Sequence, residues 1–82
     1  MKSIKFIVTA DRGIWSTSES QRNSKKVKMY AKNTILKIIT IQSNASEQTI
    51  RGQIKTSLDW VSIKDTRNQY VWMEPMTEVT KT

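Results

Sequence analysis

The chain has 82 residues and a mass of 9.5 kDa, which is the size of one small domain. With 37% hydrophobic and 26% charged residues it is too apolar for a disordered tail and too charged for a membrane protein. The 14 Lys and Arg against 7 Asp and Glu give a net charge of +7, which speeds association with polyanions.

The chain contains neither Cys nor His, and this excludes several kinds of chemistry. Zinc, iron–sulfur and haem sites lose their usual ligands, and neither a Ser–His–Asp triad nor a Cys–His nucleophile can form. Asp59 and Asp65 come nearest to a pair of catalytic carboxylates, but no pattern in the sequence brings them together. We therefore expect a protein that is not an enzyme and that has no cofactor and no metal site.

Residues with β-branched side chains dominate the composition. Ile, Val and Thr together number 25, whereas Ala numbers 3 and Leu 2. Such side chains favour strands, and the two best helix formers are nearly missing. The first strand is predicted at residues 4–9, where alternation places Phe6 and Val8 on one face.

A turn and a long loop are predicted to follow this strand. Asp11 and Gly13 are typical turn residues, because Gly adopts the positive φ that other residues resist. Residues 14–24 contain four Ser and only two apolar side chains, at their start. The pattern predicts a long polar loop anchored by Ile14 or Trp15.

The middle of the chain is ambiguous between strand and helix. Apolar residues from Val27 to Ile41 follow helical spacing in part, but residues 34–41 are β-branched at six of eight positions. We favour a strand at 26–30, a turn at 31–33 and a long strand at 34–42, and a helix is the alternative.

The second half of the chain predicts three further strands. Residues 50–56 alternate, which places Arg51, Gln53 and Lys55 on the face opposite Ile50, Gly52 and Ile54. This strand forms a hairpin with residues 34–42. Strands at 58–63 and 70–74 follow, separated by a turn with Asx hydrogen bonds at 65–68 and ended by Pro75. The residues predicted to be fully buried are Val8, Ile38, Ile54 and Val61.

These elements predict an all-β fold, a small barrel of five to six short antiparallel strands. The barrel covers residues 1–75. Residues 76–82 are predicted to form a flexible C-terminal tail.

The order of the elements resembles the SH3-like β-barrel, and most closely the SH3b (bacterial SH3-like) family. Residues 10–14, Ala-Asp-Arg-Gly-Ile, match the Ala-Asp-x-Gly-Leu entry of that family into its long first loop. Residues 24–27 precede a Thr-Ile-Leu-Lys-Ile strand at 34–38, where the family has a Gly-Thr-hydrophobic strand. Residues 59–63, Asp-Trp-Val-Ser-Ile, stand where the family often has Gly-Trp-Val. The resemblance covers roughly residues 4–74.

The resemblance implies a non-catalytic interaction module. SH3b domains mostly bind peptides, commonly cell-wall peptides, and cytoplasmic relatives bind proteins. The ligand surface of SH3-like barrels usually lies between the long first loop and the neighbouring hairpin tip. A peptide or protein segment is therefore the expected partner, and the expected ligand-binding residues are Trp15, Trp60, Tyr70 and Trp72, with Arg12 and Glu19 at the rim.

Alternation along the last two strands places three of these aromatic residues opposite Val61, Ile63 and Met73. On that shared outer face, Trp60, Tyr70 and Trp72 form either a ligand surface or a second small core under the long loop. Trp15 is either a plug for the barrel end or a contact residue. The sequence leaves these alternatives open.

Basic residues gather in the middle of the chain, namely Arg22, Lys25, Lys26, Lys28, Lys32 and Lys37. A solvated face that protects an edge strand from aggregation is one interpretation. Binding of nucleic acid is the other, and Tyr30 is the aromatic residue interleaved with the cluster.

The longest apolar run, Phe6-Ile7-Val8, is too short for a membrane span or for the core of a signal peptide. We therefore expect no membrane insertion and, by default, a cytoplasmic location. The sequence does not fix the oligomeric state.

Overall fold

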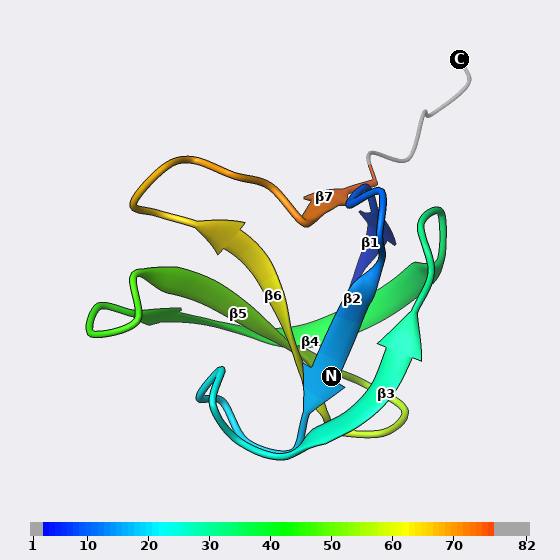
Figure 1. Cartoon of the computed structure of the whole chain (residues 1–82). Helices are drawn as coiled ribbons and strands as arrows, with labels where there is room; N and C mark the ends of the chain where they lie inside the picture. Colours follow the sequence, from blue (N-terminus) through cyan, green and yellow to red (C-terminus); the bar gives the residue numbers. More distant parts are fainter. Residues whose placement is uncertain (1–2, 77–82) are drawn as a thin grey trace.

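A computed structural model describes residues 3–76, and its secondary structure there consists of seven antiparallel strands without a helix (Figure 1). This all-β architecture agrees with the fold class predicted from the β-branched composition, with more strands than expected. The strands are β1 (Ile4–Val8), β2 (Ile14–Thr17), β3 (Lys26–Tyr30), β4 (Ile35–Asn44), β5 (Thr49–Ile54), β6 (Trp60–Asp65) and β7 (Met73–Pro75).

The strands form one curled sheet in the order β3-β2-β6-β5-β4-β1-β7. The sheet is not closed, because β3 and β7 are its two edges. The segment before β7 nevertheless runs beside β6. The Trp72 amide donates to the Ile63 carbonyl at 2.9 Å, and the Asp65 amide donates to the Tyr70 carbonyl at 2.8 Å. The chain thereby returns past β6 before β7 pairs with β1.

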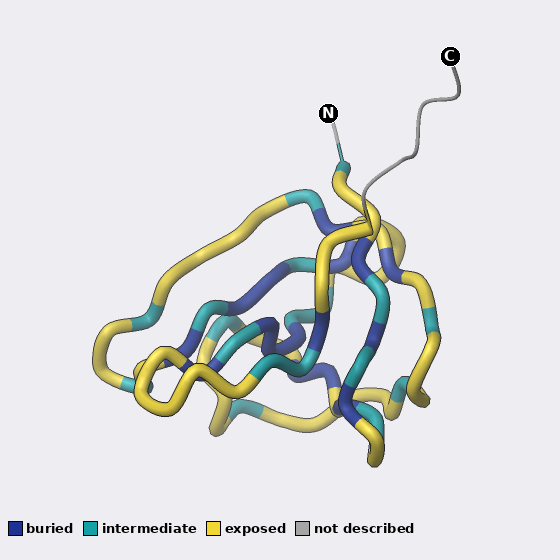
Figure 2. The backbone as a smooth tube through the Cα atoms, turned by 90° about the horizontal axis from the view of Figure 1, so that it is seen from above, coloured by how far each residue is buried: buried dark blue, intermediate teal, exposed yellow. Residues whose placement is uncertain are grey.

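Apolar residues from the two halves of the chain form the core. Figure 2 shows the buried positions in dark blue along the backbone. The four residues predicted to be fully buried are confirmed, with exposed fractions of 2% or less: Val8, Ile38, Ile54 and Val61. Gly52 lies among them, and a Cβ there would stand 2.8 Å from Ile63 Cδ1 and 2.9 Å from Ile38 Cγ2. Gly52 therefore makes room for two core side chains.

The ambiguous middle of the chain is extended. Strands β3 and β4 occupy it, and the turn between them places Asn33 at a φ of 76°. Strand β4 pairs with β1 at one end and with β5 along the rest, with a register shift between Ile38 and Thr40. The strand interpretation and the predicted β4–β5 hairpin are confirmed, and the helix is excluded.

The predicted long polar loop at residues 14–24 is wrong at its start, because Ile14–Thr17 is strand β2. Ile14 and Ser16 are buried, and Trp15 between them is exposed. The Ser16 hydroxyl group accepts from the Lys28 amide at 3.1 Å and donates to Asp59 Oδ2 at 3.4 Å. A buried Ser is tolerated where its hydroxyl group is hydrogen-bonded. A segment rich in Ser can therefore form a buried strand, and the polar composition of residues 14–24 did not indicate this one.

A second prediction that is wrong concerns the alternation along β5. Arg51, predicted on the face opposite the core residues Gly52 and Ile54, is only 2% exposed. The pairing of β5 with β6 shifts register between Ile50 and Arg51. Such an irregularity interrupts the two-residue alternation, so Arg51 and Gly52 are both buried although they are neighbours. Ile50 is half-buried and still packs against the core.

Boundaries near the C-terminus also differ from prediction. The last strand is Met73–Pro75 rather than 70–74, and Pro75 is part of this edge strand. The predicted Asx bonds are present, since Asp65 Oδ1 accepts from the Arg67 amide at 2.8 Å. The predicted tail at 76–82 lies, except for Met76, outside the described residues. Within residues 3–76, no helix has the length and apolar character needed to cross a membrane.

Truncation of Ile54 tests the assignment of the core. Ile54 is 1% exposed, and Ile54→Ala should lower the free energy of unfolding by about 2–5 kcal/mol through lost apolar burial and the remaining cavity. The matched control is Ile41→Ala on β4, because Ile41 is 50% exposed. Chemical denaturation measures both variants. Equal stabilities would contradict the assignment.

Candidate functional site

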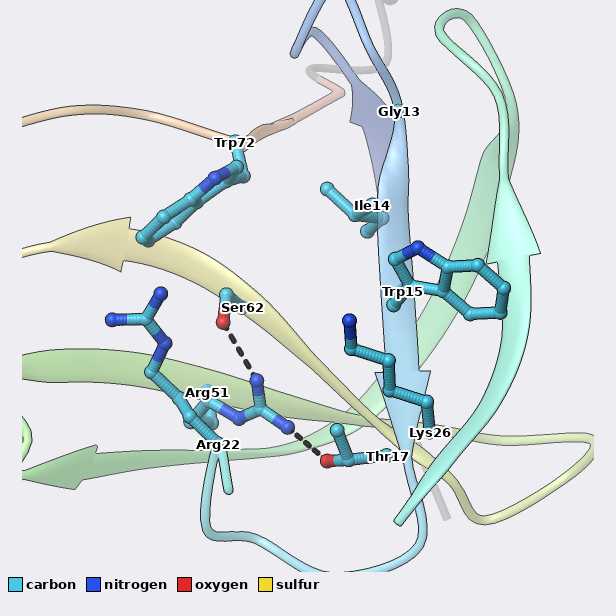
Figure 3. A pocket seen from close by; sticks show the side chains of 9 residues that line it. All are labelled: Gly13, Ile14, Trp15, Thr17, Arg22, Lys26, Arg51, Ser62 and Trp72. Atoms are coloured by element: carbon cyan, nitrogen blue, oxygen red, sulfur yellow. Dashed lines mark hydrogen bonds between the residues drawn. The ribbon is translucent and has the colours of Figure 1, made fainter. Parts of the chain in front are cut away.

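A pocket of about 240 Å³ opens between the β2–β3 hairpin and the β5–β6 part of the sheet (Figure 3). Strands β2, β3, β5 and β6, the loop after β2 and the segment before β7 all contribute to its wall. Its lining residues are Gly13, Ile14, Trp15, Thr17, Arg22, Lys26, Arg51, Ser62 and Trp72.

Arg51 supplies the buried part of this lining. Its Nη1 donates to Ser62 Oγ at 2.6 Å, and its Nη2 donates to Thr17 Oγ1 and to the Trp60 carbonyl at 3.3 Å. The guanidinium group thus lies between β6 and β2, although Arg51 belongs to β5 (Figure 3). Its Nε–H is buried without a hydrogen-bond partner among the described residues.

The surroundings of Arg51 disfavour its charge without removing it. Burial lowers the pKa of Arg51 to about 10, the nearby Glu47 carboxylate acts in the opposite direction, and the Arg22 charge lowers it further. A group with this pKa is still protonated at neutral pH. The pocket therefore contains a fixed positive charge.

Glu47, at the tip of the β4–β5 hairpin, holds the loop that carries Arg22. Both carboxylate oxygens of Glu47 accept from the Arg22 amide, at 2.9 and 3.1 Å. The Asn44 side chain donates to Glu47 Oε1 at 3.0 Å and accepts from the Glu47 amide at 3.1 Å. The long loop and the hairpin tip are therefore in direct contact beside the pocket.

Two cations at the rim of the pocket stack on aromatic rings. The Arg22 guanidinium carbon lies 5.1 Å from the centroid of the Trp72 ring. Lys26 Nζ lies 5.6 Å from the Trp15 ring on the opposite side. Each pair is within the range of a cation–π interaction, which orients the charged side chains without neutralising them.

A second pocket adjoins the first, and Gly13 and Trp72 line both. Its volume is about 400 Å³, and its other lining residues include Arg12 and Tyr70. The Tyr70 and Trp72 rings pack edge to face with centroids 5.2 Å apart. Trp72 is half-buried against the core, so its ring separates the two pockets at a fixed place.

Most of the predicted ligand-binding residues meet at these two pockets, since Trp15 and Trp72 line the first and Arg12, Tyr70 and Trp72 the second. Trp60 and Glu19 line neither of them. The shared outer face predicted for Trp60, Tyr70 and Trp72 is therefore divided, and Trp60 contributes its carbonyl group to Arg51 instead of its ring to the pockets.

The predicted basic cluster is also divided. Arg22 and Lys26 line the first pocket, and Lys28 Nζ lies 5.3 Å from the Tyr30 ring. Lys32 forms an ion pair with Asp11 at 2.8 Å, and this hydrogen bond lowers the pKa of the Asp11 carboxyl group. Lys25 is exposed beside β3, and Lys37 lies on β4 opposite Lys5 of β1.

Sequence reasoning missed three polar residues of the first pocket, Thr17, Arg51 and Ser62. A basic residue at an alternate position of a strand is typical of a solvated face. The sequence around Arg51 therefore did not indicate that its side chain is buried. The register shift that buries it is a property of the pairing with β6 rather than of the local sequence.

Comparisons of the chain with protein-family models, with curated proteins and with solved structures gave no match. The resemblance to SH3b domains is therefore supported only by sequence features such as residues 10–14, 34–38 and 59–63.

Removing the Glu47 side chain tests how the loop is held. In Glu47→Ala, the Arg22 amide loses its carboxylate partner, and stability should fall by about 1 kcal/mol. Hydrogen exchange followed by NMR should show faster exchange at the Arg22 amide. Glu74→Ala, which removes an exposed carboxylate from β7, is the matched control. Unchanged protection of the Arg22 amide from hydrogen exchange would contradict the role of Glu47 in holding the loop.

Proposed function

We propose that this chain is a non-catalytic interaction module that binds an extended peptide or protein segment across the two adjoining pockets. The observation that carries the proposal is the position of Trp72, which both pockets share. Trp15 and Tyr70 flank it with exposed fractions of 45% and 48%. Two adjoining pockets that share one fixed ring suit successive side chains of an extended segment.

Aromatic rings suit this role because they bury a large area at a small cost in conformational entropy. Trp72 is held by the core and by Tyr70, so little ordering is needed when a ligand arrives. Arg12 lines the second pocket and provides a charged rim, which affects the association rate and partner choice more than affinity.

We also propose that the sheet is an SH3-like barrel related to SH3b domains. In support, the segment before β7 bonds to β6, and β7 pairs with β1, so the chain curls back past β6 although β3 and β7 remain the edges of the sheet. The loop after β2 and the β4–β5 hairpin tip also meet beside the first pocket, near the region where the resemblance implies a ligand surface. Cell-wall peptides, the ligands of extracellular SH3b domains, are then one class of partner, and protein segments are the other.

A second candidate function is binding of single-stranded nucleic acid. The specific observation in its favour is the stacking of three cations on three aromatic rings, Arg22 on Trp72, Lys26 on Trp15 and Lys28 on Tyr30. Against it, the basic cluster is divided, and Lys32 is paired with Asp11.

Substitution of the pocket tryptophans tests the peptide proposal. Extended peptides of about 10 residues, selected by display on the wild-type chain, should lose about 2 kcal/mol of affinity, roughly thirtyfold, on Trp15→Ala. Because Trp15 is exposed, this variant should stay folded. Trp72→Phe, which keeps a ring against the core, should also weaken binding. Fluorescence titration measures the affinities.

Trp60→Phe is the matched control for these variants, because Trp60 lines neither pocket. It should bind the selected peptides as the wild type does. Equal affinities of all three variants, or the failure of any peptide to be selected, would contradict the proposal.

A further inference from the structure

Arg51 has no acidic partner in the part of the chain that the structure describes. The two ion pairs there join Lys32 to Asp11 and Arg67 to Asp65. Buried guanidinium groups are ordinarily paired with a carboxylate, because an uncompensated charge inside a protein is costly. The exposed fraction of Arg51 is only 2%. Hydroxyl and carbonyl oxygens alone accept its hydrogen bonds among the described residues.

The donors of Arg51 are not exhausted by these contacts. A guanidinium group has about five N–H donors, and three contacts are formed, which leaves Nε–H and one further N–H. The Nε–H is buried and unpartnered, and Arg51 is one of the residues that line the pocket. An unsatisfied charged donor beside an open pocket indicates a place where an external acceptor is expected.

Two more positive charges face the same space. Arg22 and Lys26 line the pocket together with Arg51, and its lining contains no Asp or Glu. The nearby Glu47 carboxylate accepts from the Arg22 amide and from Asn44, so it is engaged outside the lining. Three cations around one pocket raise the local potential and attract an anion.

We propose that this pocket binds the oxyanion of an acidic side chain, a carboxylate or a phosphate group, carried by the extended segment that the chain binds. The inference rests on the proposed peptide-binding function and names the chemistry of its ligand. Arg51 supplies the fixed charge in the wall, and Arg22 and Lys26 close on the oxyanion from the rim.

The size and chemistry of the pocket fit this ligand. A volume of about 240 Å³ is several times the roughly 30 Å³ share of one water molecule in the liquid, so the pocket holds a small oxyanion with water. Guanidinium groups donate hydrogen bonds to the oxygens of planar carboxylate groups and of tetrahedral phosphate groups. Ser62 and Thr17 fix the Arg51 side chain beforehand, so its orientation is set before the ligand binds.

Inorganic phosphate tests the pocket without a peptide. Phosphate should raise the melting temperature of the wild type relative to sodium chloride at the same ionic strength. Arg22→Gln/Lys26→Gln should lose most of this rise. Lys25→Gln/Lys28→Gln is the matched control, since it removes the same charge from exposed positions outside the pocket lining, and it should keep the rise. Equal loss in both double variants would show diffuse attraction and overturn the site.

Peptides then separate the sources of the oxyanion. One display-selected peptide is synthesised in a scan, with Ser, Asp or phosphoserine at each position in turn. At one position, Asp or phosphoserine should bind at least tenfold tighter than Ser to the wild type and the control. Arg22→Gln/Lys26→Gln should abolish the difference. Preference for Asp alone identifies a carboxylate ligand, and preference for phosphoserine alone identifies a phosphate ligand.

The failures of the two proposals are distinguishable. If the Ser, Asp and phosphoserine forms bind equally at every position, the oxyanion inference is wrong, whereas peptide binding stands. If phosphate stabilises the pocket but no peptide is selected, the peptide-binding function is wrong, and with it the inference. A third outcome is that a single-stranded oligonucleotide binds more tightly than every peptide and that both double variants lose this binding. This outcome overturns the inference in favour of the nucleic-acid candidate.

Discussion

The rest of the site depends on the hydrogen bonds that Arg51 donates across the sheet. The β2–β3 hairpin meets β6 through a single register pair, Thr17 with Trp60. Arg51 extends from β5, past β6, and donates to Thr17 and to the Trp60 carbonyl as well as to Ser62. This side chain therefore ties the hairpin to the sheet beside the pocket that both of them line.

The same side chain links stability to function. A buried charge without a carboxylate costs several kcal/mol, and a domain of this size has little stability to spare. Well-packed apolar residues often replace such a charge without loss of stability, so packing alone does not require Arg51. Burial outweighs the nearby Glu47 carboxylate in its effect on Arg51, so an anionic ligand would offset more of this cost. Glu47 supports the arrangement from outside, because it places the Arg22 loop over the opening.

The local pattern of the sequence was sufficient to predict most of the strands and the core. The β-branched run at residues 34–41 and the alternation around Ile54 are local signals, and they led to the correct β4–β5 hairpin. The aromatic residues of the pockets were also predicted, apart from the position of Trp60. The burial of Arg51 was not predictable, because it follows from a register shift between strands. Strand β2 was missed because its buried Ser16 is satisfied by distant partners, Lys28 and Asp59.

The Nε–H of Arg51 gives the most direct test of the central claim, that a buried and partly unsatisfied guanidinium group forms an oxyanion site. Its ¹⁵N–¹H resonance is observable by NMR and is assigned by its absence from Arg51→Lys. If Arg51 forms an oxyanion site, titration with phosphate at constant ionic strength should shift this resonance saturably and slow its exchange with water. A resonance that stays unchanged at millimolar phosphate, while the chain remains folded, would contradict an oxyanion site at Arg51.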